Sequence, residues 1–308
     1  MPVLSRRTLG AGLLSAALPG IARAAGPVVI AVGADPAYTP FYLASHEKMF
    51  AAAGLDVSLQ IYADGGETLN TLVAGQASLA CGAEPTTMIR IARGDIRPLA
   101  IFEQSGSYIK CVARKDIADL KDVKKWAIVP GTVSEYSAGL GIRKAGVDPK
   151  TLAFVKSAPP ELPALLARGD CDAYFAWEPW PTMGTKQGGH VLTTSGDVGY
   201  TYTLWLTASG PWLDANADAA HAILAVIAKS ADIVQKDPER AAVAVQAVAK
   251  IPRAQTLELL KDLQCGVRDF TPADFKSFDG IADFLAEQKI TASRIDYRRA
   301  LQVGFYKG

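Results

Sequence analysis

Apolar runs and segments of helical periodicity alternate along most of the chain. Short runs that are apolar throughout, or at every second position, are typical of strands, and apolar residues three and four positions apart are typical of helices. Strands are predicted at residues 28–33, 55–62, 77–82 and 96–103, with helices between them at 41–54, 67–76 and 86–94. This alternation is typical of a parallel sheet with helices on both faces.

The pattern begins again after residue 125 and later changes character. Strands are predicted at residues 126–131, 152–157 and 172–177, with helices between them at 134–146 and 161–169. After residue 210 the chain is mostly helical, with predicted helices at 218–237, 238–251 and 271–289. We therefore expect an α/β fold of two mostly parallel sheets flanked by helices, with a helical C-terminal tail.

Two distant segments match each other. Residues 72–85 (LVAGQASLACGAEP) and 166–179 (LARGDCDAYFAWEP) align without gaps, and each is predicted as helix, glycine, strand and Glu-Pro. Leucine, glycine, glutamate and proline coincide at positions 72/166, 75/169, 84/178 and 85/179. Open α/β sheets bind ligands at the carboxyl ends of their strands, where both Glu-Pro pairs stand. We expect two lobes built alike that face each other across a cleft.

The first 25 residues differ from the rest of the chain. Ser5-Arg6-Arg7 precedes a mild apolar stretch, and Ala22-Arg23-Ala24 follows it. A charged start, a short apolar region and an A-x-A cleavage site form an export signal, which we assign to residues 1–24. The paired arginines favour the twin-arginine route. A general export signal that happens to carry two arginines is the alternative.

Composition excludes several classes of partner. The 308 residues include 32 basic and 31 acidic side chains, and residues 1–24 hold three of the basic and none of the acidic ones. The mature chain is therefore close to neutral and has no basic excess for nucleic acid or for anionic membranes. No later apolar run approaches about 18 residues, so we expect no insertion into a membrane.

The sequence contains none of the common catalytic motifs. It has no G-x-S-x-G elbow, no H-E-x-x-H, no Walker loop and no G-x-G-x-x-G. His46, His190 and His221 are far apart and lack the spacing of metal ligands. The four cysteines form no C-x-x-C pair, so we expect four free thiols and no zinc or redox site. We therefore expect no metal, no cofactor and no enzymatic activity.

Several motifs, taken in their order, resemble those of the periplasmic solute-binding proteins of ABC importers, in the sulfonate, taurine, nitrate and thiamine-pyrimidine group. They are the export signal, YTPFYLASHEKMFAAAGLDV, LVAGQASLACG, PGTVSEY and AWEPW, and the resemblance covers roughly residues 27–240. It implies a two-lobed periplasmic-binding-protein fold joined by crossover strands. Lobe one would contain residues 27–112 and 206–308, and lobe two residues 113–205.

The resemblance also implies a function. A monomeric periplasmic protein would close on a small-molecule ligand and deliver it to a membrane permease that has an ATPase subunit. One alternative is an enzyme of the related thiamine-pyrimidine synthase type, which uses a cysteine-rich motif and a histidine; no cysteine cluster occurs here. The other alternative is a ligand-sensing protein of the same fold. We favour the binding protein over both.

Glu178 is the one charged residue between Ala173 and Trp180. Burial of an unpaired carboxylate costs several kcal/mol, so we expect Glu178 at the mouth of the cleft, where it accepts hydrogen bonds from a ligand. Trp177 beside it suits a small-molecule pocket, and Glu84 is its counterpart in lobe one. The alternative is that both carboxylates only cap the helices that begin at the following prolines.

The PGTVSEY segment is a second candidate. Gly131, Thr132 and Ser134 lie at a predicted strand-to-helix turn, where N–H groups and hydroxyls bind anions. Thr132 and Glu135 also fit a capping box, which would satisfy the same donors internally. The remaining candidates are Tyr38, Thr86, Tyr108 and Trp205, with Tyr202 as a weaker one. Packing within the core or between the lobes is the alternative role of the aromatic residues.

These expectations together favour one kind of ligand. The two Glu-Pro carboxylates would repel a purely anionic ligand by up to a few kcal/mol in a partly desolvated cleft. The helix start at residues 131–134 would attract an acidic group, and an aromatic lining accepts a cation or a flat ring. We therefore expect a zwitterionic or amino-bearing molecule, such as taurine or an aminopyrimidine, over nitrate or a simple alkanesulfonate.

Overall fold

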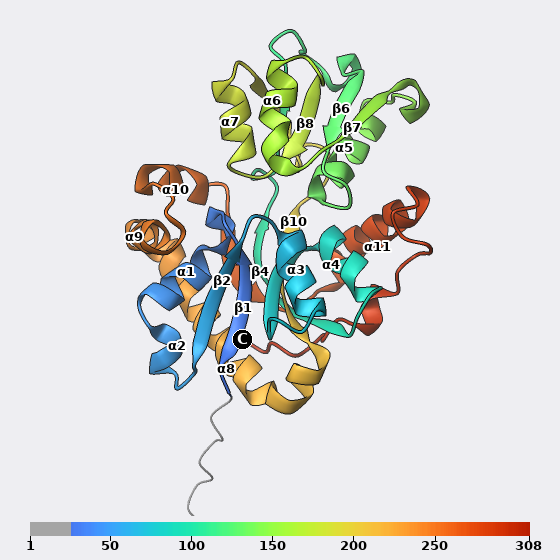
Figure 1. The fold of residues 1–308 in the computed structure, drawn as a ribbon. Coiled ribbons are helices and arrows are strands. Elements are labelled where there is room, and N and C mark those ends of the chain that lie inside the picture. Colours follow the sequence, from blue (N-terminus) through green and yellow to red (C-terminus); the bar gives the residue numbers. More distant parts are fainter. Residues whose placement is uncertain (1–25) are drawn as a thin grey trace, which may run out of the picture.

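The chain folds around two separate sheets flanked by helices, in a computed structural model that describes residues 26–308 (Figure 1). The strands of the first sheet are β1 (Val28–Gly33), β2 (Val57–Tyr62), β3 (Leu79–Ala83), β4 (Ile96–Ser105), β10 (Tyr202–Ser209) and β11 (Gln264–Arg268). The strands of the second sheet are β5 (Lys110–Ala113), β6 (Lys125–Ile128), β7 (Ala153–Lys156), β8 (Ala173–Ala176) and β9 (His190–Thr194). The expected two-lobed α/β fold is confirmed. The export signal assigned to residues 1–24 lies outside the described residues.

Both sheets are mixed rather than wholly parallel. The first has the order β11-β4-β10-β3-β1-β2, in which β1 pairs in parallel with β2 and β3 while β10 runs antiparallel to β3 and β4. The second has the order β7-β6-β8-β5-β9, in which β6 pairs in parallel with β7 and β8 while β5 runs antiparallel to β8 and β9. The chain enters the second sheet at β5 and returns to the first at β10, so these antiparallel strands adjoin the two connections.

Helices pack around both sheets and make up most of the C-terminal tail (Figure 1). Around the first sheet lie α1 (Thr39–His46), α2 (Met49–Ala52), α3 (Gly65–Val73), α4 (Glu84–Ile91), α8 (Gly210–Lys236), α9 (Pro238–Ala249), α10 (Arg253–Leu260) and α11 (Pro272–Glu287). Around the second lie α5 (Val133–Lys144), α6 (Leu162–Ala167) and α7 (Trp180–Lys186). The short 3-10 turns are η1 (Pro36–Tyr38), η2 (Leu120–Asp122), η3 (Pro149–Thr151), η4 (Pro159–Glu161) and η5 (Tyr297–Arg299). Within residues 26–308, no helix combines the length and the apolar character needed to cross a membrane.

The observed elements depart from the predicted ones in several places. Residues 41–54 form parts of two helices rather than one, because Lys48 has a left-handed backbone (φ 54°) between α1 and α2. The tail contains the strand β11 in addition to helices. The sequence pattern does not predict β5 or β9, because strands of four and five residues are too short to show a clear period.

Two short connections join the sheets and touch each other. Residues 106–109 lead from β4 to β5, and residues 195–201 lead from β9 to β10. The N–H of Gly196 donates a hydrogen bond to the carbonyl oxygen of Gly106 at 2.6 Å, and a Cβ on Gly196 would lie 2.7 Å from that oxygen. Backbone atoms cannot move aside as a flexible side chain can, so this contact requires glycine.

We expect Gly196→Ala to lower the free energy of unfolding by about 1–3 kcal/mol, as overpacking of a close contact does. Gly266→Ala is the control, because nothing lies within 4 Å of a Cβ at that position. It should change stability by less than about 0.5 kcal/mol. Denaturant titration of both variants measures the difference. Equal stabilities of the two variants would show that the close contact between the two connections can open without loss of folding free energy.

Candidate ligand-binding site

A cavity of about 50 Å³ lies between the two sheets, at the ends of strands from both. Asp35 follows β1, Asp64 follows β2 and Thr86 follows β3, while Thr132 follows β6 and Trp177 follows β8. The remaining lining residues are Ala37, Tyr38, Gly65, Gly66, Ala83, Tyr108, Ile109, Val133, Tyr202 and Leu204. Ligands of open α/β sheets bind at this edge, so the cavity is the candidate ligand site.

The structure separates the candidate residues into two groups. Those that line the cavity are Tyr38, Thr86, Tyr108, Thr132 and Trp177, and the weaker candidate Tyr202 joins them. Those that do not line it are Glu84, Gly131, Ser134, Glu178 and Trp205. The second group makes contacts within the protein, and ligand contact by the first group stays a prediction.

Asp35 is a buried carboxylate at the cavity. Its Oδ1 accepts hydrogen bonds from the N–H of Ala37 (2.8 Å) and from the hydroxyl of Tyr108 (2.9 Å). Burial raises the pKa of Asp35 to about 7 against the opposing effect of these two hydrogen bonds, and the charge of Glu178 raises it further. The group therefore titrates near neutral pH.

Asp64 brings a second carboxylate to the cavity at the start of α3. Its Oδ1 accepts hydrogen bonds from the N–H groups of Gly66 (2.6 Å) and Glu67 (3.0 Å), so it caps the helix. A Cβ on Gly65 would lie 3.3 Å from the Cα of Gly82. The small residue at 65 therefore lets the start of α3 lie close to β3, beside the cavity.

Aromatic side chains form much of the cavity wall. Tyr108 and Tyr202 stack with ring centroids 6.2 Å apart, and Tyr38 and Trp177 lie on the same cavity. Tyr202 is 2% exposed, and its hydroxyl lies beside the carboxylate of the buried Glu103. Burial raises the pKa of Glu103 well above its usual value against the opposing effect of the Tyr202 hydroxyl.

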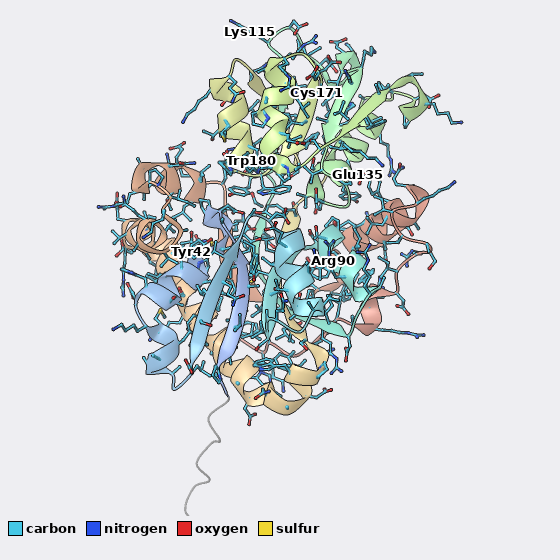
Figure 2. The ribbon with its side chains drawn as sticks, viewed as in Figure 1. Tyr42, Arg90, Lys115, Glu135, Cys171 and Trp180 are labelled. Carbon is cyan, nitrogen blue, oxygen red and sulfur yellow. The ribbon has the colours of Figure 1, made fainter. Side chains whose placement is uncertain are left out.

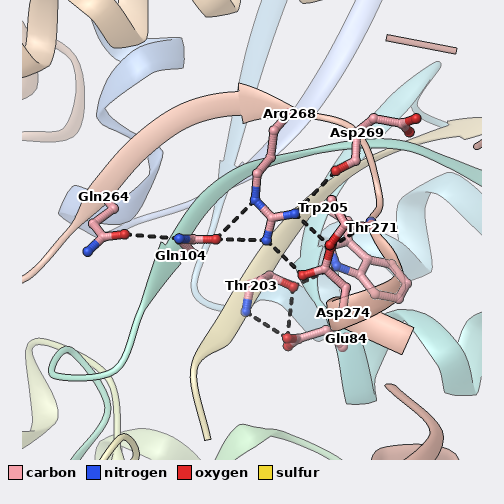
Figure 3. A network of polar contacts seen from close by, with 9 residues as sticks. All are labelled: Glu84, Gln104, Thr203, Trp205, Gln264, Arg268, Asp269, Thr271 and Asp274. Atoms are coloured by element: carbon pink, nitrogen blue, oxygen red, sulfur yellow. Dashed lines mark hydrogen bonds and ion pairs between the residues drawn. The ribbon is translucent and has the colours of Figure 1, made fainter. Parts of the chain in front are cut away.

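Glu84 is fully buried and bonds to β10, as Figure 3 shows, and also to the second connection. Its carboxylate accepts hydrogen bonds from the hydroxyl of Tyr200 (2.8 Å) and from the N–H (2.7 Å) and hydroxyl (2.8 Å) of Thr203. The indole N–H of Trp205 donates to the hydroxyl of Thr203 at 2.8 Å. Burial raises the pKa of Glu84 to about 7 against these hydrogen bonds. Glu84 and Trp205 thus belong to one internal network.

Glu178 is 2% exposed and also has partners within the protein. Its Oε2 accepts a hydrogen bond from the N–H of Thr182 in α7 (3.3 Å), and its Oε1 lies 3.7 Å from the Nζ of Lys110. Lys110 pairs more closely with Asp262, at 2.8 Å. Trp180 follows on the face of lobe two that is turned toward lobe one (Figure 2). Glu178 also lines a second hollow, together with Asp35 and Lys250. Ligand contact by Glu178 therefore stays a prediction, beside the helix-capping alternative.

The turn before α5 satisfies its donors largely by itself. The side chain of Thr132 accepts a hydrogen bond from the N–H of Ser134 (3.1 Å), and Glu135 Oε2 accepts one from the N–H of Gly131 (2.7 Å). The hydroxyl of Ser134 accepts a hydrogen bond from the N–H of Val129 (3.2 Å). These contacts match the capping alternative, except that Glu135 accepts a hydrogen bond from the N–H of Gly131 and not from the N–H of Thr132.

The lobes touch beside the cavity, where α4 and α11 of the first meet α5 of the second. The hydroxyl of Thr86 donates to the carbonyl oxygen of Gly131 at 3.3 Å. The rings of Tyr136 and Phe284 meet edge to face with centroids 5.2 Å apart. This side of the cavity is therefore closed in the structure.

Asp35 and Asp64 line the cavity, although the sequence analysis did not name them. Each stands two residues after a predicted strand, at 28–33 and 55–62. The strand-end rule that selected Glu84 and Glu178 applies equally to these aspartates. The signal for these two residues was therefore present in the sequence.

The paired sheets, the two connections and the cavity between the lobes define a fold of the periplasmic-binding-protein class. A family model described as NMT1/THI5 like matches residues 35–241, which is more than half of the chain. The chain belongs to the NMT1/THI5-like family. This confirms the group of solute-binding proteins that the sequence motifs resemble.

Named relatives have related folds and sequences. The taurine-binding periplasmic protein of Escherichia coli (strain K12) is 26% identical over 203 residues, which are 65% of this chain and 62% of that protein. The match thus spans less than two thirds of that relative. The periplasmic aliphatic sulphonate binding protein SsuA from Escherichia coli is 17% identical with a TM-score of 0.80, covering 92% of this chain and 94% of that chain. The alkanesulfonate-binding protein SsuA from Xanthomonas axonopodis pv. citri, bound to MOPS, is 16% identical with a TM-score of 0.78, covering 91% and 99%.

Proposed function

We propose that the protein is the solute-binding component of an ABC importer. Its lobes close on a small organic ligand, and the closed form delivers the ligand to a membrane permease whose ATPase subunit supplies the energy. The observation that carries this proposal is the cavity enclosed by strand ends of both sheets in a chain of this family. A ligand that contacts both lobes favours the closed state over the open one.

The site follows from the cavity lining. Tyr38, Thr86 and Tyr108 contact the ligand from the first sheet and the connection, and Thr132 and Trp177 contact it from the second sheet. Lobe one consists of residues 27–112 and 206–308, and lobe two consists of residues 113–205. The ligand is a sulfonate, taurine or an aminopyrimidine-like molecule, and the named relatives support the first two classes.

A binding role is favoured over an enzymatic one by the chemistry of the cavity. Neither cysteine nor histidine occurs among the described lining residues, so the cavity lacks the nucleophile and base of the thiamine-pyrimidine synthase type. The thiols of Cys81, Cys111, Cys171 and Cys265 are buried and unpaired. Incubation with each bound ligand should leave it chemically unchanged, as mass spectrometry can show.

The test of function is a binding screen. The purified protein is expected to gain thermal stability with at least one of taurine, alkanesulfonates, nitrate or aminopyrimidines, because a ligand that binds only the folded state stabilises it. Native mass spectrometry of freshly purified protein looks for a ligand carried from the cell. Absence of any bound small molecule in both measurements would reject the proposal.

Export makes a separate prediction. We expect cleavage after Ala24, so the protein isolated from the periplasm should begin at Ala25. Intact-mass measurement of the periplasmic fraction checks this, and Arg6→Lys with Arg7→Lys should retain the precursor in the cytoplasm if the twin-arginine route is used. A full-length product in the cytoplasm of unmodified cells would contradict export.

A further inference from the structure

We propose that the ligand carries a cationic nitrogen group, bound by the carboxylates of Asp35 and Asp64 against the aromatic wall of the cavity. The proposal rests on the proposed function, because it concerns the ligand of the same site. The carboxylates proposed to bind the ligand are Asp35 and Asp64, and they differ from Glu84 and Glu178 of the two Glu-Pro pairs. The group of the ligand that they recognise is cationic rather than anionic.

The charges around the cavity are of one sign. Asp35 and Asp64 line it, and no lysine, arginine or histidine is among its described lining residues. The lysine near this end of lobe two, Lys110, is paired with Asp262 at 2.8 Å and lies 3.7 Å from Glu178. Lys250 shares a second hollow with Asp35 and Glu178, outside this cavity. A sulfonate or nitrate ion in the cavity itself would therefore meet carboxylates and no basic lining residue.

Arg90 on α4 interacts with Asp64 by charge but forms its hydrogen bonds with other groups. Its Nε donates to the side-chain oxygen of Asn70 at 3.2 Å, and its Nη2 donates to the carbonyl oxygen of Gly66 at 3.5 Å. It is not among the residues that line the cavity. Its hydrogen bonds hold it on the surface of α3, where it supports the helix start that carries Asp64.

Both aspartates keep an oxygen available for a donor. In Asp35 the two hydrogen bonds converge on Oδ1, and Oδ2 has no partner within the described residues although the side chain is only 8% exposed. In Asp64 the two backbone donors also converge on Oδ1. An ammonium or amidinium group carries several donors and a positive charge, so it can donate to these oxygens and balance the carboxylates.

The helix starts at the cavity do not offer an equivalent anion site. Asp64 Oδ1 accepts hydrogen bonds from two N–H groups in the first turn of α3, those of Gly66 (2.6 Å) and Glu67 (3.0 Å). Thr132 and Glu135 occupy donors at the start of α5. The helix α4 begins at Glu84, which is itself a buried carboxylate. The protein's own acids and hydroxyls therefore take the positions that an anionic ligand would need.

The cavity wall suits the same ligand. Tyr38, Tyr108, Tyr202 and Trp177 present aromatic rings, and a cation over such a ring gains about 0.5–2 kcal/mol once it is desolvated. The hydroxyl of Tyr202 lies beside the buried carboxylate of Glu103, so this residue offers its ring rather than its hydroxyl. A flat or compact cation therefore has both charge complementarity and packing here.

Binding of a cation should depend on pH through Asp35, whose pKa is about 7 because of burial. The N–H of Ala37 and the hydroxyl of Tyr108 bond to this carboxyl, and the carboxylates of Glu178 and Glu103 interact with it by charge. The tyrosines that also interact with it are Tyr38, Tyr42 and Tyr202. A cation favours the ionised form, so the affinity of a permanent cation should rise about tenfold from pH 6 to pH 8. N-methylpyridinium has no titrating proton of its own and is the probe.

The main test compares ligands that share a body and differ in the head group. Calorimetry with benzylamine, benzyl alcohol and phenylmethanesulfonate, and with taurine and ethanesulfonate, is done on the full folded protein. Each amine is expected to bind at least tenfold more tightly than its sulfonate or alcohol counterpart. Asp35→Asn and Asp64→Asn should each weaken amine binding at least tenfold. Asparagine keeps the accepting oxygen and remains a good N-cap, so it removes only the charge.

One further variant serves as the control. Asp232→Asn removes an exposed carboxylate on α8 that does not line the cavity. It should leave amine affinity within about threefold of the unmodified protein. If circular dichroism shows that Asp35→Asn does not fold, the proposal is tested by Asp64→Asn and by the comparison of amines with their sulfonate and alcohol counterparts.

The outcomes separate this inference from the proposed function. If ethanesulfonate or nitrate binds as tightly as the amines, or if both aspartate variants keep amine affinity, the cationic site is wrong and the binding function stands. If no probe binds and no small molecule accompanies the purified protein, both proposals fail.

Discussion

We expect Glu84→Ala to lower the free energy of unfolding by about 3 kcal/mol or more. The carboxylate accepts hydrogen bonds from the hydroxyl of Tyr200 and from the N–H and hydroxyl of Thr203, all buried. Alanine leaves these donors without an acceptor, and each such loss costs about 1–3 kcal/mol. The ring of Tyr200 also packs edge to face on Tyr136 of lobe two, with centroids 4.9 Å apart. Through Tyr200 and Thr203, Glu84 therefore holds the second connection in contact with both lobes.

Glu84→Gln is the matched variant for this prediction. Its side-chain oxygen can accept the two hydrogen bonds from Thr203, and its amide can donate to the hydroxyl of Tyr200, which accepts as well as donates. We expect its stability to stay within about 1 kcal/mol of the unmodified protein in urea titrations near pH 4.5, where the raised pKa keeps Glu84 protonated in the folded protein. Similar losses in both variants would show that cavity or charge effects dominate instead of the hydrogen bonds.

The same carboxyl group should make stability depend on pH. The pKa of Glu84 rises from an ordinary 4.5 to about 7 on folding. A group that holds its proton more tightly when folded contributes its full stabilisation below pH 4.5 and loses it as the pH rises to about 7. The unmodified protein should therefore lose stability relative to Glu84→Gln across this range, by at most a few kcal/mol at about 1.4 kcal/mol per pKa unit.

The fold could be predicted where local chemistry determines it. Gly75 and Gly169, aligned by their sequence context, end helices with φ of 71° and 75°, as only glycine does readily. The strands before Glu84 and Glu178 are continuous apolar runs, so β3 and β8 appear directly in the pattern. Strands β5, β9 and β11 depend on pairing with distant residues, and short segments do not show this in their own sequence.

The directions of the candidate side chains could not be predicted, for a related reason. The strand-end rule locates a backbone position, but the direction of the side chain depends on partners elsewhere in the chain. Glu84 turns to Tyr200 and Thr203, which lie more than a hundred residues away. Glu178 similarly turns to Lys110 and to the N–H of Thr182. No local pattern indicates such partners, whereas Trp177, beside Glu178, does line the cavity.

Trp177→Ala should weaken ligand binding by about 2 kcal/mol or more, which corresponds to a loss of about thirtyfold in affinity. Trp177 follows β8, lines the cavity and packs against the apolar clusters of both the main core and lobe two. Its ring is therefore held in place before the ligand arrives, and a preorganised aromatic side chain loses little entropy on binding. Truncation removes this surface and opens the cavity to water.

The neighbouring tryptophan provides the control that makes the result interpretable. Trp180 is also partly exposed and packs against the apolar cluster of lobe two, but it does not line the cavity. Trp180→Ala should lose stability to a similar extent as Trp177→Ala, because both truncations remove a large packed ring. It should retain ligand affinity within about threefold. Calorimetry with the tightest-binding amine or sulfonate, on variants shown to be folded, measures both. If the two variants lose affinity equally, the effect arises from the packing of lobe two, and Trp177 does not contact the ligand.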